Sequence, residues 1–166
     1  MKLRKACLYL AICVLTLVVC DRIHTYDVLS ESFRLVDSEY QTYEASVDSV
    51  RLRLQVYTIA YGVHIEFLVI NGSSRVRLVD LGNFRVNGDG TPYEIVRMSV
   101  DGENPDTTAI WRVNSGDSLQ VLVTAGSSVH EYSPRPDEAI ITLGRVLTAS
   151  GDLIANLDSI KVVKRD

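Results

Sequence analysis

The sequence predicts an all-β domain, an antiparallel β-sandwich, and three observations support this. Apolar and polar residues alternate over much of the chain after residue 32, the period expected of strands with one buried face. Clusters of Gly, Asn, Asp and Ser interrupt the alternation at intervals of roughly ten residues, a spacing typical of sandwiches and barrels. No segment of the body sustains the 3.6-residue period of a helix.

The clearest strand covers 50–56, where Val and Leu alternate with polar residues. The segment 62–70 alternates in its first half and is apolar throughout its second, so we expect a central strand covered on both faces. Further strands are expected, in order, over 76–78, 84–86, 93–100, 109–113, 119–123, 140–147 and 160–163. The lone tryptophan, Trp111, falls at an alternating position and is expected in the core.

The first nineteen residues have the pattern of an export signal. A basic head of Lys2, Arg4 and Lys5 precedes an uncharged run over 6–19, which is shorter than the roughly 20 apolar residues that span a bilayer. We therefore divide the chain into a signal peptide or anchor helix (1–19), a tether (20–32) and a β-sandwich domain (33–166).

Leu17-Val18-Val19-Cys20 resembles the lipobox of bacterial lipoproteins, in which an aliphatic residue lies three places before a cysteine. The resemblance implies that the Cys20 thiol receives a diacylglyceryl group and that the chain is cut before it. Val19 departs from the small residue usual at its position. Simple cleavage near Cys20 and an uncleaved short anchor are the alternatives. Asp21 resembles the enterobacterial signal for retention in the inner membrane.

Cysteine usage and charge narrow the function further. All three cysteines lie within the first twenty residues, so the body has no disulfide. Residues 1–19 hold three of the 17 Lys and Arg and none of the 21 Asp and Glu, which leaves a body with a charge near −7. Such a body argues against nucleic acid as a partner, because that binding relies on clustered cations.

Residues 47–125 resemble an immunoglobulin-like module common in bacterial envelope proteins. The resemblance rests on the strand 64–70 with its Asn-Gly-Ser turn, the Phe-Arg-Val strand 84–86 before a Gly-Asp-Gly turn, and the Asn-Ser-Gly-Asp turn 114–117, where Ser115 replaces the usual proline. It implies an envelope location on the periplasmic or extracellular face. Such modules are often adhesive or accessory and carry no catalytic residues.

The sequence offers weak candidates for catalysis and metal binding. His64 and Glu66 share a strand face and could bind a metal or share a proton, but nothing nearby supplies a third zinc ligand, so a polar outer face is the favoured interpretation. The same argument applies to His130 and Glu131, while His24 is expected to be solvated in the tether. There is no G-x-S-x-G serine elbow. We therefore predict no enzymatic activity and no cofactor.

The acidic turns offer an alternative function, ligand or calcium binding. Asn87, Asp89 and Glu94 could supply oxygens, but their spacing is not that of a calcium loop, and turn formation explains them without an ion.

The favoured prediction is a protein-interaction or assembly module of the cell envelope, bound to the membrane through lipid on Cys20 and to an envelope protein partner through loops or a sheet edge. Arg51 and Arg53, on one strand face, are the candidate recognition pair.

Overall fold

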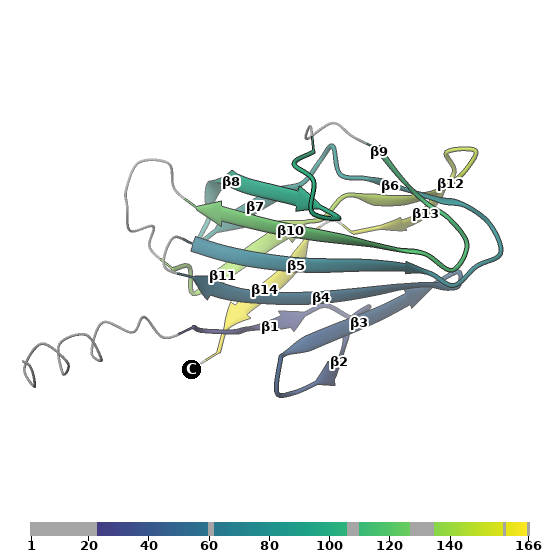
Figure 1. Cartoon of the computed structure of the whole chain (residues 1–166). Coiled ribbons are helices and arrows are strands. Elements are labelled where there is room, and N and C mark those ends of the chain that lie inside the picture. Colours follow the sequence, from purple (N-terminus) through teal and green to yellow (C-terminus); the bar gives the residue numbers. More distant parts are fainter. Residues whose placement is uncertain (1–22, 60–61, 106–109, 127–134, 158, 166) are drawn as a thin grey trace, which may run out of the picture.

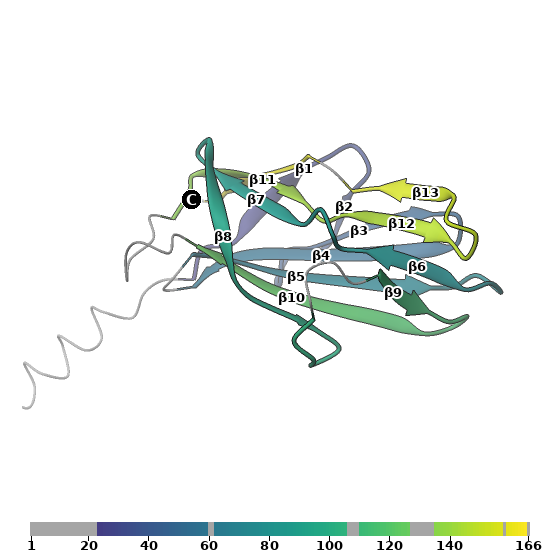
Figure 2. The same cartoon turned by 90° about the horizontal axis from the view of Figure 1, so that it is seen from above.

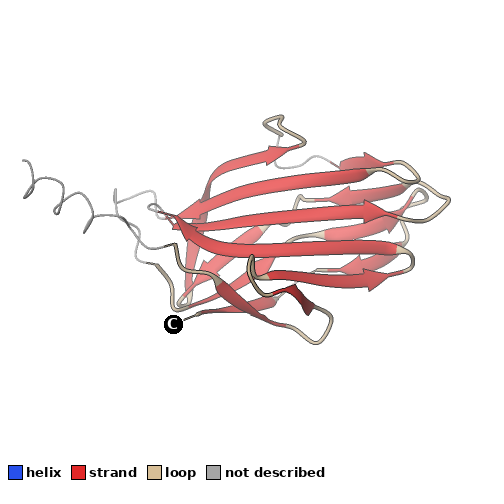
Figure 3. Cartoon of the chain, turned by 60° about the horizontal axis from the view of Figure 1, so that its bottom comes forward, coloured by secondary structure: helices blue, strands red, loops and turns tan. Residues whose placement is uncertain are grey.

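The computed structural model describes residues 23–59, 62–105, 110–126, 135–157 and 159–165, and these residues form strands and loops only (Figures 1 and 3). The expected signal or anchor helix lies outside the described residues. No helix in the described part is long and apolar enough to cross a membrane. The strands are β1 (Tyr26–Leu29), β2 (Arg34–Asp37), β3 (Thr42–Val47), β4 (Val50–Ile59), β5 (Gly62–Asn71), β6 (Arg77–Asp80), β7 (Arg85–Gly88), β8 (Thr91–Val100), β9 (Ile110–Val113), β10 (Ser118–Gly126), β11 (Glu138–Thr142), β12 (Arg145–Thr148), β13 (Leu153–Asn156) and β14 (Ile160–Lys164).

The strands form two sheets, and every strand pairing is antiparallel, which confirms the predicted all-β antiparallel class. The large sheet has the order β1-β14-β11-β7-β8-β10-β5-β4-β3-β2, and the small sheet has the order β13-β12-β6-β9. The small sheet lies over β4, β5 and β10 (Figure 2). Leu52, Phe67 and Val121 of the large sheet and Val79 and Val146 of the small sheet belong to one buried apolar core.

The large sheet curls, and β8 provides the bend. Its first residues pair with β7, with Tyr93 opposite Val86, whereas the rest of the strand pairs with β10. The curl brings the β1 end of the sheet back to β4, where a bridge joins Thr25 to Tyr57 and the Thr58 amide donates to the His24 carbonyl at 2.7 Å. The segment before β1 is thus fixed to the domain.

Several predicted strands are confirmed, notably 50–56 in β4 and 62–70 in β5. The segment 140–147, predicted as one strand, is instead two strands in different sheets, β11 and β12. Gly144 makes the crossing possible, because its φ of +107° suits glycine and a Cβ there would lie 2.1 Å from the Asp80 carbonyl oxygen.

Strands β1, β2, β3 and β13 were not predicted. Three of them have only four residues, too few to show a period. Strand β1 also corrects the expected tether, because Tyr26–Leu29 pairs with β14 inside the range 20–32. Its Tyr26 side chain is fully buried and donates to the Pro136 carbonyl at 2.7 Å.

Strand β5 is central, as predicted, between β10 and β4. The expectation that it is covered on both faces is wrong. Phe67 and Val69 are buried in the core, but Leu68 and Ile70 on the opposite face are only half-buried. The outer face of β5 therefore lies open to solvent, and this face holds the candidate site.

Candidate functional site

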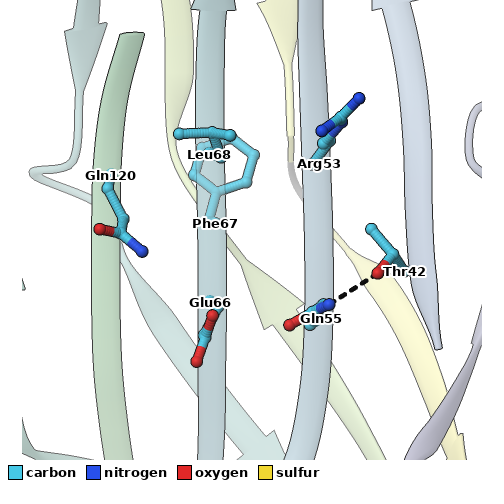
Figure 4. Close-up of a pocket in the computed structure, with 7 residues that line it drawn as sticks. All are labelled: Thr42, Arg53, Gln55, Glu66, Phe67, Leu68 and Gln120. Carbon is cyan, nitrogen blue, oxygen red and sulfur yellow. Dashed lines mark hydrogen bonds between the residues drawn. The ribbon is translucent and has the colours of Figure 1, made fainter. Parts of the chain in front are cut away.

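The outer face of β3, β4, β5 and β10 contains a shallow hollow with a volume of about 230 Å³ (Figure 4). The strand register builds it: Arg53 lies opposite Leu68, which lies opposite Gln120, and in the next row Gln55 lies opposite Glu66. Residues at opposed positions of antiparallel strands point to the same face, so these side chains surround one point. The lining residues are Thr42, Arg53, Gln55, Glu66, Phe67, Leu68 and Gln120.

Three polar side chains of the hollow are each fixed by one bond at the sheet surface. Arg53 Nε donates to Glu44 Oε2 at 2.9 Å, and Gln55 Nε2 donates to Thr42 Oγ1 at 2.6 Å. Glu66 Oε1 accepts a bond from the Tyr57 hydroxyl at 2.9 Å. Each group keeps a further hydrogen-bonding atom that has no partner among the described residues.

His64 and Glu66 share this face, as the alternation predicts, but they bond to different partners. His64 Nδ1 lies 3.0 Å from Thr124 Oγ1, and its ring centroid lies 4.8 Å from that of Tyr57. Burial lowers the pKa of His64, and Arg97 adds to this, while Glu66 opposes it. Burial, and then the bond to Glu66, raise the pKa of Tyr57. Both shifts favour the neutral forms of the His64 imidazole and the Tyr57 hydroxyl. Among the described residues, no hydrogen bond joins His64 to Glu66, so the pair is not arranged for direct proton transfer.

Arg51 and Arg53 both project from the outer face of β4 and are exposed. Only Arg53 reaches the hollow. The Arg53 side chain is paired with Glu44 and is 44% exposed. Arg51 lies one row away, opposite Ser46 on β3 and Ile70 on β5. The structure thus separates the two predicted recognition residues by position, with Arg53 at the hollow and Arg51 outside it.

In the acidic turn between β7 and β8, the Asp89 carboxylate bonds to backbone amides. Both carboxylate oxygens of Asp89 accept bonds from amides, those of Asp137 at 3.2 Å and Glu138 at 3.1 Å, which fastens the β7–β8 turn to β11. Asn87 lines a separate small hollow beside Lys161, and Glu94 is exposed on β8. Within the described ranges, no group of three or more His, Cys, Asp and Glu side chains could hold a metal ion.

Four of the predicted site residues, Cys20, Asp21, His130 and Glu131, lie outside the described residues. Conversely, sequence reasoning did not single out Gln55, Leu68 or Gln120. They are far apart in the chain and only the register joins them. One feature of the sequence could have indicated the site, the apolar residues on the outer face of 67–70. We predicted that other parts of the protein cover this face, and the structure shows that they do not.

The fold and site define an all-β, two-sheet protein with an open polar hollow on its larger sheet. Comparison of the chain with protein-family models, curated proteins and solved structures finds no match.

Proposed function

We propose that this protein is a non-catalytic accessory module of the cell envelope, anchored through lipid on Cys20 and binding another envelope protein through a sheet edge. The observation that carries the proposal is that strand β9 is a regular edge strand with an exposed apolar side chain. It is an edge of the small sheet, it pairs with β6 in unbroken register, and its Ile110 side chain is 56% exposed. An added strand would gain main-chain hydrogen bonds and contact with Ile110.

The other edges suit a partner less well. Strand β2 carries an irregularity at Val36 and charges at both ends, and β13 carries one at Ile154. Bulges and charges are devices that hinder pairing at sheet edges. The fourth edge, β1, lies against β4 through the bridge between Thr25 and Tyr57. Strand β9 has a single charged residue, Arg112, and no bulge.

The position of the anchor agrees with this assignment. Cys20 lies four positions before His24, which is bonded to Thr58. A lipid on Cys20 would therefore hold that end of β4 within about 14 Å of the anchored residue. In Figure 1, β9 and β13 lie toward the opposite end of the domain from the start of β1. A membrane-anchored chain would therefore present β9 away from the bilayer.

The resemblance to immunoglobulin-like envelope modules supports the location through its turns. Asn71-Gly72-Ser73 ends β5, and Asn114–Asp117 precedes β10, as the resemblance implies. The division into ten and four strands differs from the seven to nine strands of immunoglobulin domains. The proposed similarity to the envelope modules is therefore limited to these turns and to the envelope location.

Two measurements on the full chain test the proposal separately. The intact mass of membrane-extracted protein is expected to show the loss of residues 1–19 and the gain of a diacylglyceryl group, and the Cys20→Ala variant should lack this gain. A mass without the lipid would refute the proposed lipid anchor.

For the edge, a photoreactive phenylalanine analogue is placed at position 110 or, as control, at 153, where Leu153 is 60% exposed on the irregular edge β13. One discrete crosslinked adduct with another protein, formed from position 110 and not from position 153, supports strand addition at β9. Equal crosslinking from the two positions, or no adduct from position 110, refutes it.

A further inference from the structure

We propose that the hollow on the outer face of β3, β4, β5 and β10 is a binding site for a neutral, polyhydroxylated ligand, a sugar ring of an oligosaccharide. The site is separate from the β9 edge and does not depend on the proposed function. The inference rests on the hydrogen-bonding groups that face the hollow and on the balance of charge around it.

The unused atoms are both donors and acceptors. Arg53 retains its two terminal nitrogens as donors, while Gln55 Oε1 and Glu66 Oε2 are acceptors without a partner in the described chain. The Gln120 side-chain amide supplies one more donor group and one more acceptor. A hydroxyl group donates and accepts at once, so a ring with neighbouring hydroxyls matches such a mixed lining.

Charge disfavours simple ions. The guanidinium of Arg53 is already paired with Glu44, and the carboxylate of Glu66 is already bonded to Tyr57. An anion would meet two carboxylates, and a cation would meet an arginine and no cluster of three ligating side chains within the described residues. An apolar ligand would contact Leu68 and otherwise leave polar groups without partners.

The size and rigidity of the hollow fit the same ligand. Its volume of about 230 Å³ has room for several water molecules, and Leu68 lies between Arg53 and Gln120 as an apolar surface for the face of a ring. Gln55 is held by its bond to Thr42 (Figure 4), and Arg53 and Glu66 are held by their bonds to Glu44 and Tyr57, so binding need not immobilise these side chains afresh. The hollow is open, so we expect a dissociation constant of about 0.1–1 mM, with further rings extending along the sheet face.

The three glutamines of the chain provide a direct test. Gln55 and Gln120 line the hollow, whereas Gln41 is buried and donates to the Ser38 carbonyl at 2.6 Å. Side-chain amide signals of ¹⁵N-labelled full-length protein are followed in a phosphocholine detergent, so that no sugar headgroup competes. The probes are maltotriose, cellotriose and chitotriose, with inorganic phosphate and calcium as charged controls.

We expect the Gln55 and Gln120 signals to shift in a saturable way with at least one saccharide, while the Gln41 signal stays in place. Failure of all three saccharides, shifts caused only by phosphate or calcium, or equal movement of Gln41, would overturn the proposal.

Variants then locate the contact. Gln120→Ala removes an exposed side chain that has no internal bond, and we expect affinity to fall about two- to tenfold. Ser118→Ala, two residues earlier on the same strand face, is the matched control and should leave affinity unchanged. Glu66→Gln should retain binding within about threefold, because a neutral acceptor suffices for a hydroxyl. A Gln120→Ala chain that binds as well as Ser118→Ala, or a Glu66→Gln chain that loses binding altogether, would place the ligand elsewhere or make it a cation.

Discussion

Replacing Asn71 by alanine should be among the most damaging single changes in the domain. Its side chain is fully buried at the end of β5 and joins three segments. Asn71 Nδ2 lies 2.7 Å from the Arg75 carbonyl oxygen and 3.0 Å from those of Val113 and Asn114. Asn71 Oδ1 accepts bonds from the Ser73 amide at 3.1 Å and the Ser73 hydroxyl at 2.7 Å. The asparagine therefore ties β5 to the end of β9 and to the following turn.

The magnitude follows from these bonds. The amide group has two hydrogens for three carbonyls, so one hydrogen is shared, and together with the two bonds to Oδ1 about four hydrogen bonds are lost. The bonds at Ser73, Arg75 and Asn114 lie near solvent and are partly replaced by water, at a net cost of about 0.5–1 kcal/mol each. The Val113 carbonyl is buried and keeps its desolvation penalty of about 1–3 kcal/mol. We expect Asn71→Ala to lower the free energy of unfolding by about 2.5–6 kcal/mol.

Urea unfolding of the purified chain measures this. With a slope of about 2 kcal/mol per molar urea, the midpoint should fall by roughly 2 M. The matched control is Asn156→Ala, an exposed asparagine at the end of β13, which should stay within about 0.5 kcal/mol of the parent. A loss below about 1 kcal/mol for Asn71→Ala, or equal losses for the two variants, would refute the network as the source of stability.

Three further predictions concern other positions. Gly144→Ala should prevent folding or lower thermal stability severely, because Gly144 has a positive φ and the new Cβ would lie 2.1 Å from a carbonyl oxygen. The control is Gly151→Ala, which also has a positive φ but has no atom within 4 Å of the new Cβ, and it should cost only about 1–2 kcal/mol. Thermal denaturation distinguishes the two variants. The pKa of half-buried His64 is lowered, so the folded state binds fewer protons than the unfolded state. Its contribution to stability is therefore complete above about pH 6.5 and is lost as the pH falls toward the folded pKa. His64→Gln should flatten this part of the pH profile of urea midpoints, and an unchanged slope would contradict the assignment. Asp80→Asn breaks the ion pair with half-exposed Arg145, whose Nη2 lies 2.5 Å from Asp80 Oδ2. The free energy of unfolding should fall by about 1–2 kcal/mol in low salt and by less in high salt. A loss that does not depend on salt would contradict an electrostatic origin.

The long strands could be predicted because their burial alternates over many residues. In β4 the even-numbered positions from Val50 to Thr58 are buried, and the odd-numbered positions from Arg51 to Tyr57 face solvent or are half-buried. Over such a length the hydrophobic pattern fixes which face is inside. In contrast, the four residues of β1 or β13 carry too little pattern, and their pairing depends on strands distant in the chain.

The candidate site was predictable only in part. Arg53 was singled out from the sequence, and the apolar outer face of 67–70 was noticed but assigned to a buried surface. Whether Leu68 is covered depends on where the small sheet lies, and that sheet packs on the other face of β5. Gln120 joins the hollow only because β10 pairs with β5 in a register that places it opposite Leu68.

One repeated tetrapeptide shows what each level decides. Arg-Leu-Val-Asp occurs as β2 (Arg34–Asp37) and again as β6 (Arg77–Asp80), and it forms a strand in both places. In β6 it lies between β12 and β9 with three of its four residues buried, and its two charges are paired with Asp48 and Arg145. In β2 it lies at the end of the large sheet with three of its four residues exposed. The sequence by itself determined the all-β class and the inward face of the long strands, because these depend on local period. Only the tertiary structure decided which strand became an edge, which face stayed open and where the hollow formed, because burial and pairing come from neighbours that the local sequence does not contain.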